Sequence, residues 1–158
     1  MTKDPFENGT TVEIESGALR KIPLFRRLNE SNLQLLAFTS ETRVYRPGET
    51  LIRQSEQSDE AYIILKGRVG VEVDTGTGPS EVAQLGKNEL IGEIAVLCGT
   101  ARSATVVAIE EVRVLRIDKS TFFRLMREFP EIAEEVMRVL ALRLERTTRE
   151  LAVLKAKS

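Results

Sequence analysis

The sequence predicts a mainly β domain, a small antiparallel jelly roll or sandwich, with helices before and after it. Three observations support this prediction. Short apolar segments recur at intervals of roughly ten residues between residues 43 and 118, with glycines at the corners. The apolar spacing before this region is irregular, and after it the period changes from two to between three and four. At 158 residues the chain fits one domain with a core of ordinary size.

The composition is that of a soluble globular protein, with 42% hydrophobic and 30% charged residues. The net charge of −1 gives no global basic field that would attract nucleic acid or an anionic membrane, so neither is expected as a partner. The sequence shows no long apolar segment and no N-terminal signal, which predicts a cytoplasmic protein.

Residue types that carry most enzymatic and metal chemistry are scarce. Histidine is absent, and Cys98 is the single cysteine, so an internal disulfide and a cysteine cluster for zinc are excluded. Cys98 is interpreted as a small hydrophobe or a loop thiol. No catalytic constellation is found, so we expect no enzyme activity, no metal and no cofactor.

The N-terminal region divides into a polar end and a helical segment. Residues 1–11 are expected to be a flexible end. In residues 12–42 the irregular apolar spacing, broken by Pro23, predicts one or two short helices. Asn29 is a suitable N-cap for a further helix that carries Leu33 on its apolar face.

Residues 43–118 are expected to form the β-barrel. Val69, Val71 and Val73 alternate with small or acidic residues, which predicts a strand with one buried face. Residues 74–80 are rich in glycine and predict a long hairpin loop.

Residues 119–158 are expected to be helical. Asp118 is a plausible N-cap for an amphipathic helix, which Pro130 ends while starting another. The second helix carries a heptad stripe, and this stripe predicts a homodimer through the C-terminal helix. The stripe consists of Met137, Leu140, Leu144, Thr147, Leu151 and Leu154.

Residues 91–105, with the sequence IGEIAVLCGTARSAT, are the candidate site. Gly92 removes the side chain where the backbone must turn, residues 93–97 can form one short helical turn, and Gly99 closes it. Arg102 follows ten residues after Gly92. The free N–H groups of a helix N-terminus together with a guanidinium suit a phosphate.

The order Gly-Glu-Ile-Ala, a hydrophobic pair, Gly-Thr and Arg-Ser-Ala-Thr resembles the phosphate-binding cassette of the cyclic-nucleotide-binding domain family. The resemblance covers roughly residues 20–155. It implies an eight-stranded jelly-roll barrel, Glu93 on the ribose 2′-hydroxyl, Arg102 on the cyclic phosphate, and amides of the short helix around it. It implies cAMP as ligand, and cGMP is possible because a hydroxyl such as that of Ser103 can favour guanine. The remaining cassette positions in contact with the ligand would be Gly92, Ile94, Ala95 and Ala104.

A second resemblance lies in the run 142–148, which is similar to the central helix of the bacterial catabolite activators in this family. It implies that Thr147 and Thr148 contact the adenine amino group and that Arg143 stacks on the purine. The alternative is a polar interruption that sets the register of a coiled coil.

Pocket-wall residues follow from the same family pattern. Val71, Val82 and Leu85 match wall positions, and their alternative is plain barrel core. For Arg102 the alternative is a surface arginine, and for Glu93 it is a charge that favours the short helix. Many family members have proline where this chain has Ala101.

The resemblance implies a regulatory sensor domain, bacterial in type, whose ligand moves its C-terminal helix and so reports to a dimer partner or a fused effector. One alternative is a ligand-free jelly-roll module for dimerisation or docking. Another is the excised sensor of a transcription regulator or signalling enzyme. No helix-turn-helix domain is expected within these 158 residues.

Overall fold

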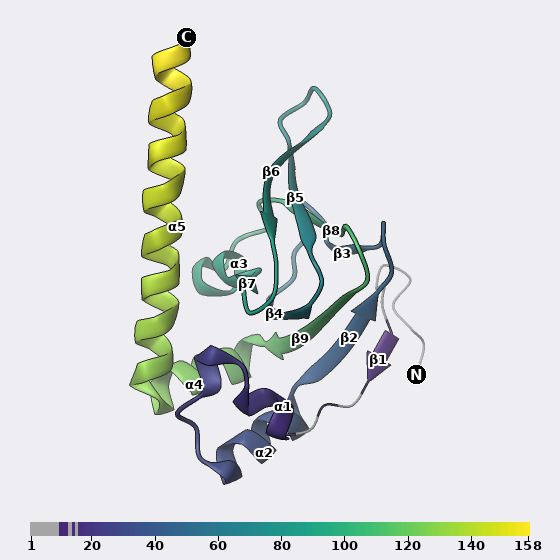
Figure 1. Cartoon of the computed structure of the whole chain (residues 1–158), viewed down its shortest axis with the longest axis vertical. Coiled ribbons are helices and arrows are strands. Elements are labelled where there is room, and N and C mark those ends of the chain that lie inside the picture. The colour runs from purple at the N-terminus through teal and green to yellow at the C-terminus, as the bar shows by residue number, and fades with distance from the viewer. Residues whose placement is uncertain (1–9, 13, 15) are drawn as a thin grey trace. The chain divides into compact units, whose positions relative to one another are not determined.

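The computed structural model describes residues 10–12, 14 and 16–158 (Figure 1). The chain divides into two compact units, one ending at Phe122 and one running from Phe123 to Ser158. The first unit contains the N-terminal helices and all strands of the described residues, and the second contains most of the C-terminal helical region.

The N-terminal helices follow the local sequence signals. Helix α1 spans Ser16–Arg20, a 3₁₀ turn spans Pro23–Phe25, and helix α2 spans Glu30–Thr39. The side-chain oxygen of Asn29 accepts a hydrogen bond from the Asn32 N–H at 2.9 Å, so the predicted N-cap is confirmed.

The strands form two antiparallel sheets. One sheet has the order β1-β2-β9-β4-β7 and the other β3-β8-β5-β6. The strands are β1 (Thr10–Val12), β2 (Glu41–Tyr45), β3 (Thr50–Ile52), β4 (Glu60–Lys66), β5 (Val69–Asp74), β6 (Pro79–Leu85), β7 (Leu90–Ile91), β8 (Thr105–Ala108) and β9 (Val112–Asp118).

The barrel core lies between the two sheets, and both contribute side chains to it. Tyr45 of β2, Ile64 of β4 and Val69 of β5 are buried together with residues of β8 and β9. The predicted mainly β fold with a jelly-roll barrel and flanking helices is thus confirmed.

Strand β1 extends the first sheet beyond the eight expected strands. Thr10 pairs with Val44 and Val12 with Thr42, in an antiparallel ladder. Thr10 and Thr11 belong to the segment that was expected to be a flexible end, and here they pair with β2. Residues 1–9 of the expected end lie outside the described residues.

The β5–β6 hairpin carries an irregularity at the candidate pocket wall. Val71 pairs with Ala83 and Glu72 with Glu81, so Val82 bulges out of the ladder. Its side chain is 57% exposed. Barrel core is therefore the wrong reading for Val82, whereas Leu85 is buried in the core and Val71 packs against it.

Helices α4 (Lys119–Glu128) and α5 (Pro130–Lys157) match the predicted C-terminal helices. A carboxylate oxygen of Asp118 accepts from the Thr121 N–H at 2.8 Å, and Pro130 stands in the first turn of α5, as predicted. Four residues of the heptad stripe are exposed apolar side chains, namely Met137, Leu144, Leu151 and Leu154.

Candidate functional site

The candidate site is built on the short helix α3 (Glu93–Cys98), between β7 and β8. Gly92 precedes the helix with φ of +79°, and Gly99 ends it with φ of +65°. Both values lie in the left-handed region that glycine adopts without steric cost. The glycines thus set the two ends of the predicted helical turn.

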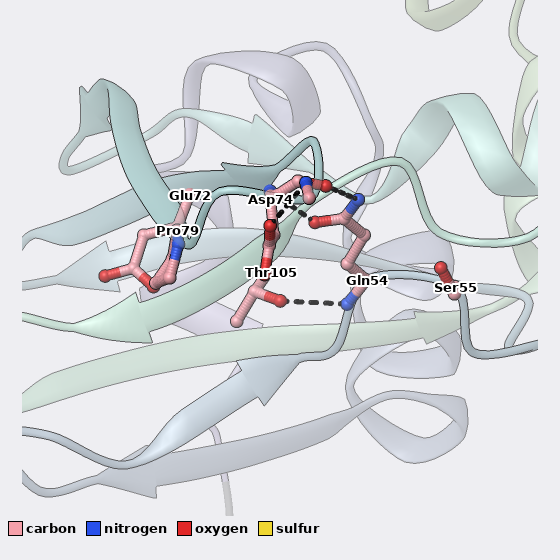
Figure 2. A pocket seen from close by; sticks show the side chains of 7 residues that line it. Gln54, Ser55, Glu72, Asp74, Pro79 and Thr105 are labelled. Carbon is pink, nitrogen blue, oxygen red and sulfur yellow. Dashed lines mark hydrogen bonds between the residues drawn. The ribbon is translucent and has the colours of Figure 1, made fainter.

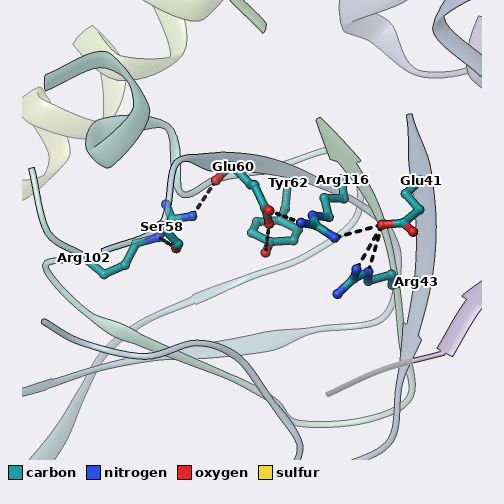
Figure 3. Close-up of polar contacts among 7 residues, drawn as sticks. All are labelled: Glu41, Arg43, Ser58, Glu60, Tyr62, Arg102 and Arg116. Carbon is teal, nitrogen blue, oxygen red and sulfur yellow. Dashed lines mark hydrogen bonds and ion pairs between the residues drawn. The ribbon is translucent and has the colours of Figure 1, made fainter. Parts of the chain in front are cut away.

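Arg102 is the buried positive charge of the site. Arg102 is only 4% exposed, so the alternative of a surface arginine is wrong. Nε donates to Oγ of Ser58 at 2.7 Å, Nη1 to the carbonyl oxygen of Gly92 at 2.7 Å, and Nη2 to that of Glu60 at 2.6 Å. Figure 3 shows the guanidinium turned toward the start of β4.

All three partners of the Arg102 guanidinium are electrically neutral. In the part of the chain that the structure describes, it forms no ion pair with a carboxylate. Burial lowers the pKa of Arg102, and nearby acidic groups, among them Asp59 and Glu93, oppose this shift. The side chain stays charged at any physiological pH. One N–H on each terminal nitrogen is left for an anion.

Glu93 and Ala95 lie inward on α3, with Glu93 only 3% exposed. A buried carboxylate is rare without partners, and this one engages in interactions within the protein. Ile94 and Ser103 are exposed, and Ala104 is half-buried. The structure therefore brings Glu93, Ala95 and Arg102 together with Gly92. Cys98 is exposed at the end of α3, so it is not a buried hydrophobe.

The three C-terminal residues of the predicted site lie on α5 in the second unit. Thr147 and Thr148 are exposed and Arg143 is partly buried. The hydroxyl of Thr148 donates to the carbonyl oxygen of Leu144 at 2.8 Å, one turn earlier in the same helix.

A polar network that no sequence pattern indicates continues from the Glu60 end of the Arg102 site. The Glu60 carboxylate pairs with Arg116 and accepts from the Tyr62 hydroxyl at 2.9 Å. Arg116 also pairs with Glu41, which pairs with the buried Arg43. The network runs across β4, β9 and β2 (Figure 3). Its members are 17 to 75 positions apart along the chain when they belong to different strands, so only the strand pairing reveals it.

A pocket of about 270 Å³ opens beside α3. It is lined by the Arg102 partner Ser58 and by Ala95 of α3. The other lining residues are Gln57, Asp59, Gly99, Thr100 and Lys119.

A second pocket, of about 590 Å³, lies near the tip of the β5–β6 hairpin and contains none of the predicted site residues. Figure 2 shows how Gln54 occupies one side of it. The side-chain amide of Gln54 donates one hydrogen bond to the backbone of Asp74 and accepts another from it. The backbone N–H of Gln54 donates to Thr105 Oγ1. These contacts give the pocket a structural explanation, because they fasten the hairpin to β3.

Among the described residues, no helix is long and apolar enough to cross a membrane. No group of three His, Cys, Asp or Glu side chains in that part of the chain could hold a metal ion.

Comparison with known proteins agrees with this geometry. The sequence profile of the cyclic nucleotide-binding domain matches residues 42–129. The cyclic AMP receptor protein of Thermus thermophilus is 29% identical over 133 residues, which cover 84% of this chain and 62% of that protein. The cAMP-dependent protein kinase regulatory subunit of Colletotrichum orbiculare is 32% identical over 108 residues, covering 68% of this chain and 27% of that protein.

A solved structure shows the same fold. The catabolite activator protein of Thermus thermophilus superposes with a TM-score of 0.72 at 29% identity, covering 84% of this chain and 63% of that chain. The present chain thus spans less than two thirds of the length of each of these relatives.

Proposed function

The chain belongs to the family of cyclic nucleotide-binding domains, and from this premise we propose that it is a receptor module for a cyclic mononucleotide, with cAMP preferred over cGMP. The relatives named above extend well beyond the part that this chain matches, and the effector of this domain would be a partner chain or a fused domain.

The buried charge of Arg102 is the observation that carries the proposal. A guanidinium that is 4% exposed and has only neutral hydrogen-bond partners has lost most of its hydration without forming a direct ion pair, although acidic groups lie nearby. An anion bound to the remaining N–H groups of Arg102 would replace the lost hydration and neutralise the charge. The single negative charge of a cyclic phosphate satisfies this need, and the guanidinium fork can hold two of its oxygens.

The remaining ligand contacts follow the family pattern. We assign Glu93 to the ribose hydroxyl, and Gly92, Ile94, Ala95, Ser103 and Ala104 to the surroundings of the phosphate. Val71, Val82 and Leu85 would form the pocket wall, where the exposed side chain of Val82 is available to a ligand. Arg143, Thr147 and Thr148 would meet the base.

Coupling to the C-terminal helix is the regulatory part of the proposal. Capture of the phosphate would draw the cassette inward, and α5 would repack over the base and report the bound state. Switching such an equilibrium from mostly off to mostly on requires the ligand to prefer one state by about 5 kcal/mol. A charge-assisted phosphate contact together with a base contact is of the right order.

A ligand-free dimerisation module is the second candidate. The exposed apolar stripe of α5 favours it, because that stripe would serve a homodimer without any ligand. A calorimetric titration with cAMP, repeated with cGMP, separates the two. Micromolar or tighter binding of cAMP and weaker binding of cGMP would support the receptor. Absence of binding to either nucleotide would contradict it and leave the dimerisation module.

A further inference from the structure

Ser58 stands out because its position in the sequence gives no hint of a role. It belongs to the loop between β3 and β4, 44 positions before Arg102, and it is half-buried. Its hydroxyl oxygen accepts the Nε–H of Arg102 at 2.7 Å, a length typical of a strong charge-assisted hydrogen bond (Figure 3).

The backbone brings Ser58 to this place. The Ser55 N–H donates to the carbonyl oxygen of Arg102 at 2.8 Å, and the Arg102 N–H donates to that of Glu56 at 2.9 Å. The loop and the segment around Arg102 are therefore joined as a short ladder. Because the backbone is fixed on both sides, the contact between Ser58 and Arg102 does not depend on a freely moving loop.

Ser58 differs from the other two partners of Arg102 because it accepts through its side chain. The carbonyl oxygens of Gly92 and Glu60 belong to the backbone and would be present whatever side chains stood there. Ser58 Oγ is the side-chain acceptor of the guanidinium among the described residues. It holds Nε, the nitrogen next to the aliphatic stem, so it determines the rotation of the guanidinium plane about that stem.

We propose that Ser58 is a positioning residue for Arg102, which fixes the plane in which the guanidinium presents its two remaining N–H groups to a bound cyclic phosphate. The inference rests on the proposed function and names a determinant of phosphate geometry within that site. Without the hydroxyl, a buried Nε–H loses its acceptor and the guanidinium can turn. The phosphate would then meet donors that are no longer aligned with its oxygens.

The test compares Ser58→Ala with Ser58→Thr, which keeps a hydroxyl at the same carbon. Calorimetry measures the affinity of each variant for cAMP and for the two diastereomeric phosphorothioates, in which sulfur replaces one or the other exocyclic oxygen of the phosphate. We expect Ser58→Ala to weaken cAMP binding about threefold to tenfold and to change the ratio between the diastereomers. Ser58→Thr should restore both. A merely structural role would lower the unfolding temperature but leave that ratio unchanged.

A second measurement needs no ligand. In the ligand-free parent, the Nε–H of Arg102 should give a ¹⁵N–¹H NMR signal that exchanges slowly with water, and Ser58→Ala should abolish it. An unchanged signal in Ser58→Ala, or an unchanged affinity and diastereomer ratio, would overturn the role of Ser58. If the parent binds no cyclic nucleotide while the NMR signal behaves as expected, the proposed function fails and only the contact with Arg102 stands.

Discussion

Gly92 and Arg102 are matched to each other. Nη1 of Arg102 donates to the carbonyl oxygen of Gly92 at 2.7 Å, and a Cβ placed on Gly92 would stand 2.8 Å from the same nitrogen. The glycine therefore serves two needs at once. It adopts a φ of +79°, and it leaves the space that the guanidinium occupies.

Replacing Gly92 by alanine should weaken cAMP binding by more than the strain of a left-handed backbone alone would. The left-handed conformation costs a residue other than glycine about 1–2 kcal/mol, and the new Cβ must also displace Arg102. Gly99→Ala is the matched control, because Gly99 has φ of +65° with open space around its Cβ position. Thermal unfolding and calorimetric titration measure both effects. Equal cAMP affinities in the two variants would contradict the match between Gly92 and Arg102.

Arg102→Ala should reduce cAMP affinity roughly tenfold to a hundredfold, since it removes a charge-assisted contact worth about 1.5–3 kcal/mol. Arg102→Lys should fall between the parent and Arg102→Ala, because an ammonium keeps the charge but lacks the planar fork. Arg53→Ala serves as control, as Arg53 is exposed in the loop between β3 and β4. An Arg102→Ala protein that binds cAMP as tightly as the parent would refute the receptor proposal.

The cassette could be predicted from sequence because its chemistry is local. Gly92, Glu93 and Arg102 lie within eleven consecutive residues, and burial alternates along β8, the strand that follows them. Asn29 and Asp118 were also predictable as N-caps, since a cap contacts an N–H only three residues away.

The partners of Arg102 could not be predicted in the same way. Ser58 and Glu60 come from a distant polar loop and strand start with no periodic pattern, and Glu60 contributes a backbone oxygen that any residue would supply. The exposed bulge at Val82 could not be predicted for a similar reason. The register between β5 and β6 decides which side chain leaves the ladder, and the local apolar pattern does not contain it.

Thr148 should favour adenine over guanine. Its hydroxyl proton is committed to the carbonyl oxygen of Leu144, so its oxygen can accept from the adenine amino group but cannot donate to the guanine carbonyl. Thr148→Val should therefore lower the affinity for cAMP about twofold to tenfold and leave that for cGMP unchanged. Thr148→Ser keeps the hydroxyl and should behave like the parent. Competition titrations with both nucleotides measure the preference, and an equal loss for both would argue against this contact.

Asp118 should make a pH-dependent contribution to stability. The hydrogen bond from the Thr121 N–H lowers the pKa of its carboxyl, although burial partly opposes the shift. A folded-state pKa below that of the unfolded chain stabilises the fold above the unfolded value, about 4, and this contribution is lost as the pH falls through the folded value.

Asp118→Asn isolates this contribution, because an amide oxygen can still cap the helix but does not titrate. The free energy of unfolding of the parent minus that of Asp118→Asn should be constant above about pH 5 and should fall below about pH 4. Denaturant unfolding between pH 3 and pH 7 measures this difference. A difference that stays constant down to pH 3 would show that Asp118 has the same pKa in the folded and unfolded chains.

Association through α5 should depend on the heptad stripe rather than on exposed apolar area in general. Leu144 belongs to the stripe and is 68% exposed, whereas Leu142 is off the stripe and 50% exposed. The substitution to glutamate has the same helix propensity cost and the same charge at both positions. A difference in association between the two variants therefore measures the contribution of the heptad stripe alone.

We expect sedimentation velocity over a range of concentrations to show a dimer for the parent and for Leu142→Glu, and a monomer for Leu144→Glu. If both variants dissociate, the contact is a diffuse apolar one without heptad register. If neither does, α5 is not the dimer interface, and the coupling of the ligand to a partner chain must run through another surface.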